Sequence, residues 1–113
     1  MKLKNKIIAG LTTVLLFTVG VGVASAGPVA GGKLYFNGGQ TGTYVYSEIY
    51  DNDWSFSEGK IINDDGYRYE VKASVKVCGS VTTSGWLPDY ARITEDRKWY
   101  CNETAHYDYR QAK

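Results

Sequence analysis

Residues 67–78 alternate between two sets of side chains, and this pattern constrains the fold more than any other feature of the chain. One set is mostly apolar and the other mostly polar: Tyr67, Tyr69, Val71, Ala73, Val75 and Val77 against Arg68, Glu70, Lys72, Ser74, Lys76 and Cys78. Successive side chains of a β-strand point to opposite faces, so the stretch predicts a long strand with one buried and one solvated face. Strands of this kind are typical of antiparallel sheets.

Shorter segments on either side of this stretch also predict strands. Residues 54–62 are expected to pair back onto 67–78 through a turn at 63–66, whose Gly66 supplies a positive φ angle. Further strands are expected at 43–50, 90–94, 98–103 and 104–110, with a charged turn at 95–97. About six antiparallel strands separated by turns indicate an all-β fold, a small β-sandwich or a compact barrel, and we predict the sandwich.

Residues 1–26 have the pattern of a secretory signal peptide. Lys2, Lys4 and Lys6 precede an uncharged apolar run at 7–23, and the small residues 24–26 form a cleavage site before Gly27. The alternative is an uncleaved membrane anchor, but glycines and threonines dilute the apolar run. The pattern therefore predicts a protein that is secreted and folds outside the cell.

Removing residues 1–26 from the 113-residue chain leaves 87 residues, enough for one small domain. We expect residues 27–42 to form a glycine-rich N-terminal arm, with a short strand at 33–37, and residues 43–113 to form the antiparallel β domain. The only cysteines, Cys78 and Cys101, lie in this domain. In an oxidising exterior two cysteines predict a disulfide, the alternative being two free thiols.

The charge of the exported part argues against a nucleic-acid partner. Without the three lysines of residues 1–26, ten basic side chains face twelve acidic ones, a net charge of −2. No basic cluster remains that could neutralise phosphates. A cationic pore-forming peptide is disfavoured for the same reason.

Aromatic residues are the most distinctive part of the composition. All ten tyrosines and all three tryptophans follow residue 26. Aromatic residues suit strands and cores, so core filling is one explanation. The other is an exposed aromatic surface that holds a sugar or a lipid-linked ligand.

Patterns that would support catalysis or metal binding are weak. His106 and Asp108 share one face of the last expected strand, where a solvated pair is the commoner arrangement. Zinc would have to use Cys78, Cys101 and His106, which lack the usual local ligand spacing. The acidic residues at 51–53 do not continue into a calcium-binding loop, and those at 64–65 fall in an expected turn. We therefore predict a protein that is not an enzyme and uses no cofactor and no metal.

Several short segments resemble the lactococcin 972 family of secreted bacteriocins. They are the signal peptide followed by Gly31-Gly32, the tyrosine- and serine-containing stretch 44–50, Ala73-Ser74-Val75-Lys76, Ser84-Gly85-Trp86, Tyr90-Ala91-Arg92, and the ending with Asn102, Ala105, Tyr107 and Tyr109. The resemblance implies a small sandwich of antiparallel sheets. It also implies an antibacterial protein that engages the lipid-linked wall precursor and blocks septum formation in related bacteria, without turnover.

The expected function is therefore a secreted bacteriocin that binds a cell-envelope component, with Trp54, Trp86, Tyr90 and Trp99 as the candidate ligand contacts. The alternatives are a non-toxic secreted module that binds cell wall or polysaccharide, and a small wall hydrolase. The sequence leaves a monomer and a homodimer both open, and it does not identify an immunity protein or an exporter.

Overall fold

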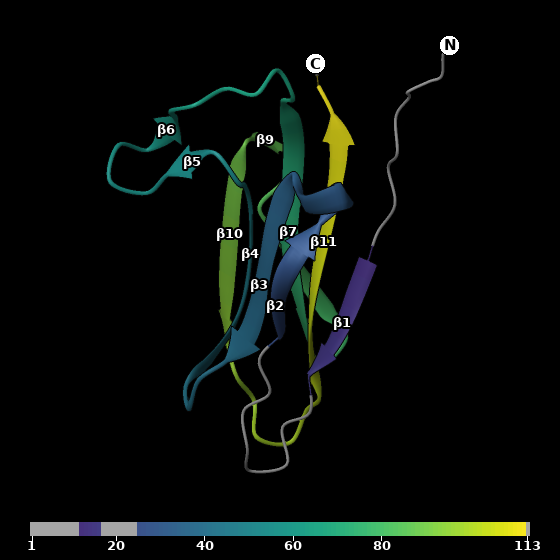
Figure 1. Ribbon diagram of the computed structural model, residues 1–113. Helices are drawn as coiled ribbons and strands as arrows, with labels where there is room; N and C mark the ends of the chain where they lie inside the picture. The colour runs from purple at the N-terminus through teal and green to yellow at the C-terminus, as the bar shows by residue number, and fades with distance from the viewer. Residues whose placement is uncertain (1–11, 17–24, 113) are drawn as a thin grey trace.

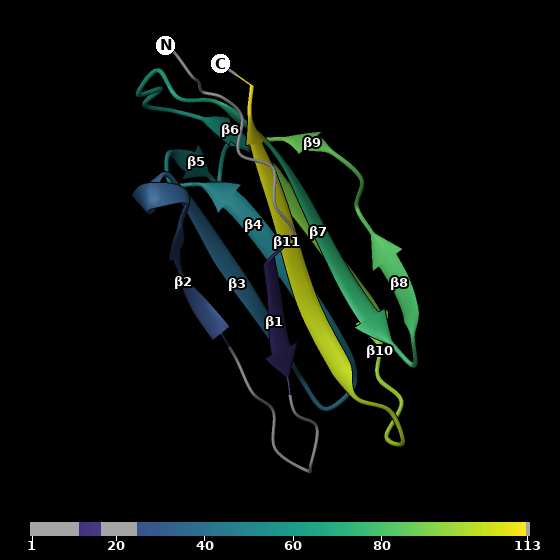
Figure 2. The same cartoon turned by 90° about the vertical axis from the view of Figure 1, so that its right-hand side faces the viewer.

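Two antiparallel sheets lie face to face in the computed structural model, which describes residues 12–16 and 25–112 (Figures 1 and 2). The first sheet contains β1 (Thr12–Leu16), β11 (Glu103–Gln111), β7 (Tyr69–Val77) and β8 (Ser80–Thr83) in that order, and β9 (Leu87–Pro88) also pairs with β7. The second contains β10 (Tyr90–Asp96), β4 (Tyr44–Asp51), β3 (Leu34–Gln40) and β2 (Ser25–Val29). A separate hairpin joins β5 (Trp54–Ser55) to β6 (Lys60–Ile61). The all-β prediction is confirmed, with eleven strands in the described residues where about six were expected.

β7 confirms the alternation that predicted it. Its apolar set, from Tyr69 to Val77, is buried, whereas Tyr67 precedes the strand and is exposed, with the Lys33 Nζ 4.0 Å from its ring centroid. Cys78 and Gly79 follow the strand with φ angles of 53° and 81° and form the two-residue turn that leads into β8. Two consecutive positive φ angles are typical of the type I′ turns that join twisted strands.

The core lies between the two sheets and is built from both inner faces. Leu34, Val45 and Ile49 of the second sheet and Val71 and Val75 of the first are completely buried. The hydroxyl of Ser47, also buried, donates a hydrogen bond of 2.6 Å to the His106 carbonyl on the opposite sheet. The polar group at this position is therefore satisfied, and it links the two layers.

Residues 27–42 do not form a separate arm, contrary to our expectation, although the short strand expected at 33–37 is present within β3. They complete β2, form a short 3-10 turn (Ala30–Gly32) and continue into β3, which lies inside the second sheet. The glycine pair of β3 is explained by two aromatic rings. A Cβ atom on Gly38 would lie 2.6 Å from the Phe36 ring, and one on Gly39 would lie 2.6 Å from the Tyr46 hydroxyl. Glycine here makes room for rings on both faces of the strand.

Two other expected elements are wrong. Residues 54–62 do not pair with 67–78 but fold on themselves as the β5–β6 hairpin, while β7 pairs with β11, β8 and β9. Residues 98–103 do not form a strand either, because β10 continues to Asp96 and β11 begins only at Glu103. The intervening segment, residues 97–102, is a turn, which we call the 97–102 loop.

The predicted disulfide is present. Cys78 and Cys101 are bonded, with their Cα atoms 5.2 Å apart. The bond joins the turn after β7 to the 97–102 loop and so ties one end of both sheets together. A link of this kind restricts the unfolded chain and adds stability to a small domain.

The predicted signal peptide, residues 1–26, lies mostly outside the described residues. Of its length, Thr12–Leu16 form β1, which pairs with β11, and residues 25–26 begin β2. Within the part of the chain that the structure describes, no helix is long and apolar enough to cross a membrane.

Candidate functional site

The outer face of the second sheet carries a row of three tyrosines. Tyr35 of β3 lies opposite Tyr50 of β4, and Tyr50 lies opposite Tyr90 of β10. The ring centroids of Tyr35 and Tyr50 are 5.5 Å apart, and those of Tyr50 and Tyr90 are 6.5 Å apart. Since residues opposite each other in an antiparallel pair point to the same face, the register alone aligns these rings.

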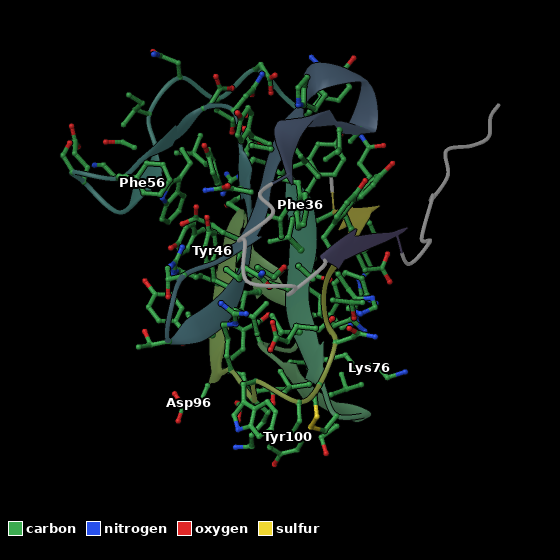
Figure 3. The ribbon with its side chains drawn as sticks, turned by 90° about the horizontal axis from the view of Figure 1, so that it is seen from below. Phe36, Tyr46, Phe56, Lys76, Asp96 and Tyr100 are labelled. Carbon is green, nitrogen blue, oxygen red and sulfur yellow. A yellow bond between two sulfur atoms is a disulfide. The ribbon has the colours of Figure 1, made fainter. Side chains whose placement is uncertain are left out.

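The β5–β6 hairpin adds two further rings to this row. Trp54 stacks on Tyr90 with a centroid distance of 5.1 Å and an interplanar angle of 8°. Phe56 meets Tyr50 edge-on at 4.8 Å and Tyr90 at 5.7 Å, and it is 58% exposed. Figure 3 shows Phe56 at the rim of the molecule. We call Tyr35, Tyr50, Trp54, Phe56 and Tyr90 the aromatic platform.

Two charged residues, Glu48 and Arg92, border the platform on the same face. The Tyr90 hydroxyl donates a 2.9 Å hydrogen bond to Glu48 Oε2, and Arg92 Nη1 lies 3.6 Å from the same oxygen. The Arg92 guanidinium also lies over the Tyr46 ring, 4.9 Å from its centroid. Burial, followed by the bond to Glu48, raises the pKa of Tyr90 to about 12. Its hydroxyl therefore keeps its proton at physiological pH.

Asp51 sets the turn that carries Trp54 onto the platform. Asp51 is 2% exposed as a residue, and its Oδ1 accepts a 2.8 Å hydrogen bond from the Asp53 N–H. Burial raises the pKa of Asp51 to about 6; the Asp53 N–H opposes this rise, and the neighbouring carboxylates of Asp53, Asp65 and Asp89 add to it. The turn therefore contains a carboxyl group whose charged form is unfavourable.

Asp51 should make the fold more stable in weak acid than at neutral pH. Its pKa is raised in the folded state, so its contribution is complete below the unfolded value near 4 and is lost as the pH rises through about 6. We expect Asp51→Asn, which keeps an acceptor for the Asp53 N–H, to raise the free energy of unfolding at pH 7 by about 1 to 3 kcal/mol. Urea unfolding at pH 5, 6 and 7 should show a flatter pH dependence for the variant.

Asp65→Asn is the matched control for this prediction. The Tyr67 N–H and the Lys33 ammonium lower the pKa of Asp65, so its charged form stabilises the fold at neutral pH. This variant should be slightly less stable than the parent at pH 7, because the lost contacts with the Tyr67 N–H and Lys33 outweigh the relief of its repulsion on Asp51. A loss of stability in Asp51→Asn that persists at every pH would contradict the proposed cost of the buried charge.

Trp86 lies apart from the platform, against the first sheet. Its ring lies between Lys72, whose Nζ is 4.9 Å from the ring centroid, and Arg110, whose Cζ is 4.2 Å from it. Arg110 is also paired with Glu70 at 2.6 Å across the β7–β11 ladder. Trp86 therefore packs over charged side chains of the β7–β11 strand pair.

Trp99 lies in a third place, on the 97–102 loop. It is 89% exposed, and its ring contacts Tyr100 edge-on at 5.4 Å. The four candidate contact residues therefore divide into one pair, Trp54 with Tyr90, and two separate tryptophans.

His106 and Asp108 both lie on β11, as the sequence indicated. The His106 Nε2 is 2.5 Å from the Thr104 hydroxyl, and the Asp108 Oδ1 accepts a hydrogen bond of 2.8 Å from the Tyr109 N–H. Burial lowers the pKa of His106, with a smaller contribution from Lys76. Within residues 12–16 and 25–112, no three His, Cys, Asp or Glu side chains are grouped so that they could hold a metal ion.

Sequence reasoning missed Tyr35, Glu48, Tyr50 and Phe56 as members of the site. A signal for two of them was present, since the alternation in 43–50 places Glu48 and Tyr50 on one face, opposite Val45 and Ile49. Phe56 had no such signal, because its position depends on the fold of the β5–β6 hairpin.

Searches of protein-family descriptions, curated proteins and solved structures find no match to this chain.

Proposed function

We propose that the protein is a secreted antibacterial protein that binds a cell-envelope component of competing bacteria through the aromatic platform. The favoured ligand is a lipid-linked wall precursor, and the expected consequence of binding is inhibition of septum formation. No turnover is involved. The platform is the observation on which this proposal depends.

The geometry of the platform suits a glycan. Its rings come from three adjacent strands and a hairpin, and Phe56 leaves more than half of its surface to solvent. Ring faces pack against the C–H faces of sugars, while a few placed polar groups fix the orientation of a ligand. Glu48, Arg92 and the Tyr90 hydroxyl provide such groups at the border of the platform.

Two features of the chain support action outside the cell. The pattern of residues 1–26 is that of an export signal, and the Cys78–Cys101 disulfide is typical of oxidising compartments. The resemblance to lactococcin 972 proteins is what favours an inhibitor of septation over a passive binder.

The alternative is a non-toxic module that holds wall polysaccharide. The same aromatic platform supports it, because stacking on sugars does not require an effect on growth. Binding to isolated walls without any change in cell division would favour this alternative.

The test compares Trp54→Ala with the parent protein. Removing the indole takes away the ring that stacks on Tyr90, so we expect at least tenfold weaker binding to wall and membrane fractions of sensitive bacteria. Septation is scored by microscopy with the same two proteins. Tyr67→Ala removes an exposed ring outside the platform and should bind like the parent.

Thermal unfolding must show that the Trp54→Ala fold is intact. Equal binding by a folded Trp54→Ala protein would refute a role for the platform. Unchanged growth and septation across a broad panel of related bacteria would refute the antibacterial function.

A further inference from the structure

The 97–102 loop presents two aromatic side chains to solvent at the end of the molecule remote from the β5–β6 hairpin. Trp99 is 89% exposed and Tyr100 is 65% exposed, and they contact each other rather than the core. Figures 1 and 2 show the loop extending beyond the ends of β10 and β11, while β5 and β6 lie at the opposite end. This surface is therefore separate from the aromatic platform.

The loop is held firmly although its tip is exposed. Cys101 is bonded to Cys78, and its N–H donates to the Lys98 carbonyl at 3.0 Å. At the other end, the Arg97 N–H donates to the Thr43 carbonyl at 2.9 Å, and the Arg97 guanidinium lies 3.2 Å from the buried Glu103 carboxylate. Figure 3 shows Tyr100 close to the disulfide. A loop fixed in this way loses little conformational freedom when its tip is bound.

The two rings are too small a surface for a stable protein partner. A Trp and a Tyr offer at most about 250 Å² each, whereas a stable protein interface buries about 800 Å² on each side. The tip projects, and the cavity of about 250 Å³ beside the loop is lined by residues such as Cys78, Asp96 and Lys98 and by neither of the two rings. A deformable surface that can surround a protruding tip fits this shape better than the rigid surface of a second folded protein.

We propose that Trp99 and Tyr100 form an anchor that inserts into the headgroup region of a lipid bilayer. Indole and phenol rings are enriched at this depth because each has an apolar body and one polar group. Exposed Asp96 and Lys98 precede the rings in the chain and remain in water or among headgroups. Together with exposed Glu95 they carry charges of both signs without a basic excess, so the attraction is apolar and does not depend on an anionic bilayer.

The anchor would supply a contact of its own, at the end of the molecule opposite the platform. The inference depends on the 97–102 loop and not on the platform. It can be tested with vesicles that contain no glycan.

The experiment measures partition of the protein into phosphatidylcholine vesicles by co-sedimentation and by the blue shift of tryptophan emission. The protein is the form secreted by cells expressing the full chain, with its N-terminus determined by mass spectrometry, because residues 7–23 would themselves bind lipid. Trp99→Ala should weaken partition about tenfold and abolish most of the blue shift. Tyr67→Ala, which removes an exposed ring at another position, should partition like the parent.

Three results would overturn the anchor. They are no partition of the parent protein, equal partition of Trp99→Ala and the parent, and partition that requires phosphatidylglycerol and disappears at high salt. If residues 1–26 are retained, the ratio of the partition coefficients of the parent and Trp99→Ala remains informative, because both proteins then carry these residues. Loss of wall binding in Trp54→Ala with normal vesicle partition would separate the platform from the anchor.

Discussion

Arg97→Met is expected to lower the free energy of unfolding by about 3 to 5 kcal/mol, because it leaves a buried carboxylate without its counter-charge. Glu103 is completely buried, and the Arg97 Nε lies 3.2 Å from its Oε1. Neither oxygen of Glu103 has an aligned hydrogen-bond donor among the described residues, so the ion pair is its main compensation. Urea unfolding at pH 7 measures the loss.

A double variant separates the charge from the packing. Arg97→Met combined with Glu103→Leu removes both charges and fills a similar volume, so it should recover more than half of the lost stability. Arg92→Met breaks the more exposed pair with Glu48 and should cost less than about 1 kcal/mol. A single Arg97→Met variant as stable as the parent would show that Glu103 does not need its partner.

Removing the disulfide with Cys78→Ala and Cys101→Ala is expected to cost roughly 3 kcal/mol, given the 23-residue separation of the two cysteines. This is a large fraction of the stability of a small domain. Urea unfolding with and without a reducing agent measures the effect. The parent should shift to a lower midpoint on reduction, and the variant should not.

Both predictions concern the same end of the sandwich. The disulfide and the Arg97–Glu103 pair hold the 97–102 loop from its two sides. A disulfide-free protein with unchanged stability would mean that the ion pair alone fixes the loop. The vesicle partition of that variant would then show whether rigidity matters for the exposed rings.

Local pattern was sufficient for the strands that form the centre of each sheet. The alternation at 67–78 and at 43–50 predicted β7 and β4 together with their buried faces, because the two-residue period of a strand is visible in the sequence. The disulfide followed from the count of cysteines and the expected compartment. Strand alternation depends on residues that are neighbours in the chain, and disulfide formation depends on cysteine chemistry that many folds allow.

The glycines of residues 27–42 do not distinguish an arm from a strand. Gly38 and Gly39 are compatible with a flexible arm, yet they lie in β3 beneath the rings of Phe36 and Tyr46. The same residue type serves flexible segments and crowded strands, and only the neighbouring strands distinguish the two cases. The strand predicted at 98–103 is absent for a related reason. Its aromatic residues suit a strand, but they belong to a turn held by Cys101 and Arg97.

The candidate site could likewise be predicted from the sequence only in part. Strand alternation alone places Tyr50 and Glu48 on one face of β4. Their assembly with Tyr35, Tyr90 and Trp54 required the pairing register of β3, β4 and β10 and the position of the β5–β6 hairpin. Side-chain alternation is a property of consecutive residues, whereas register and hairpin placement result from packing between segments distant in the chain, so the surface could be recognised only in the folded protein.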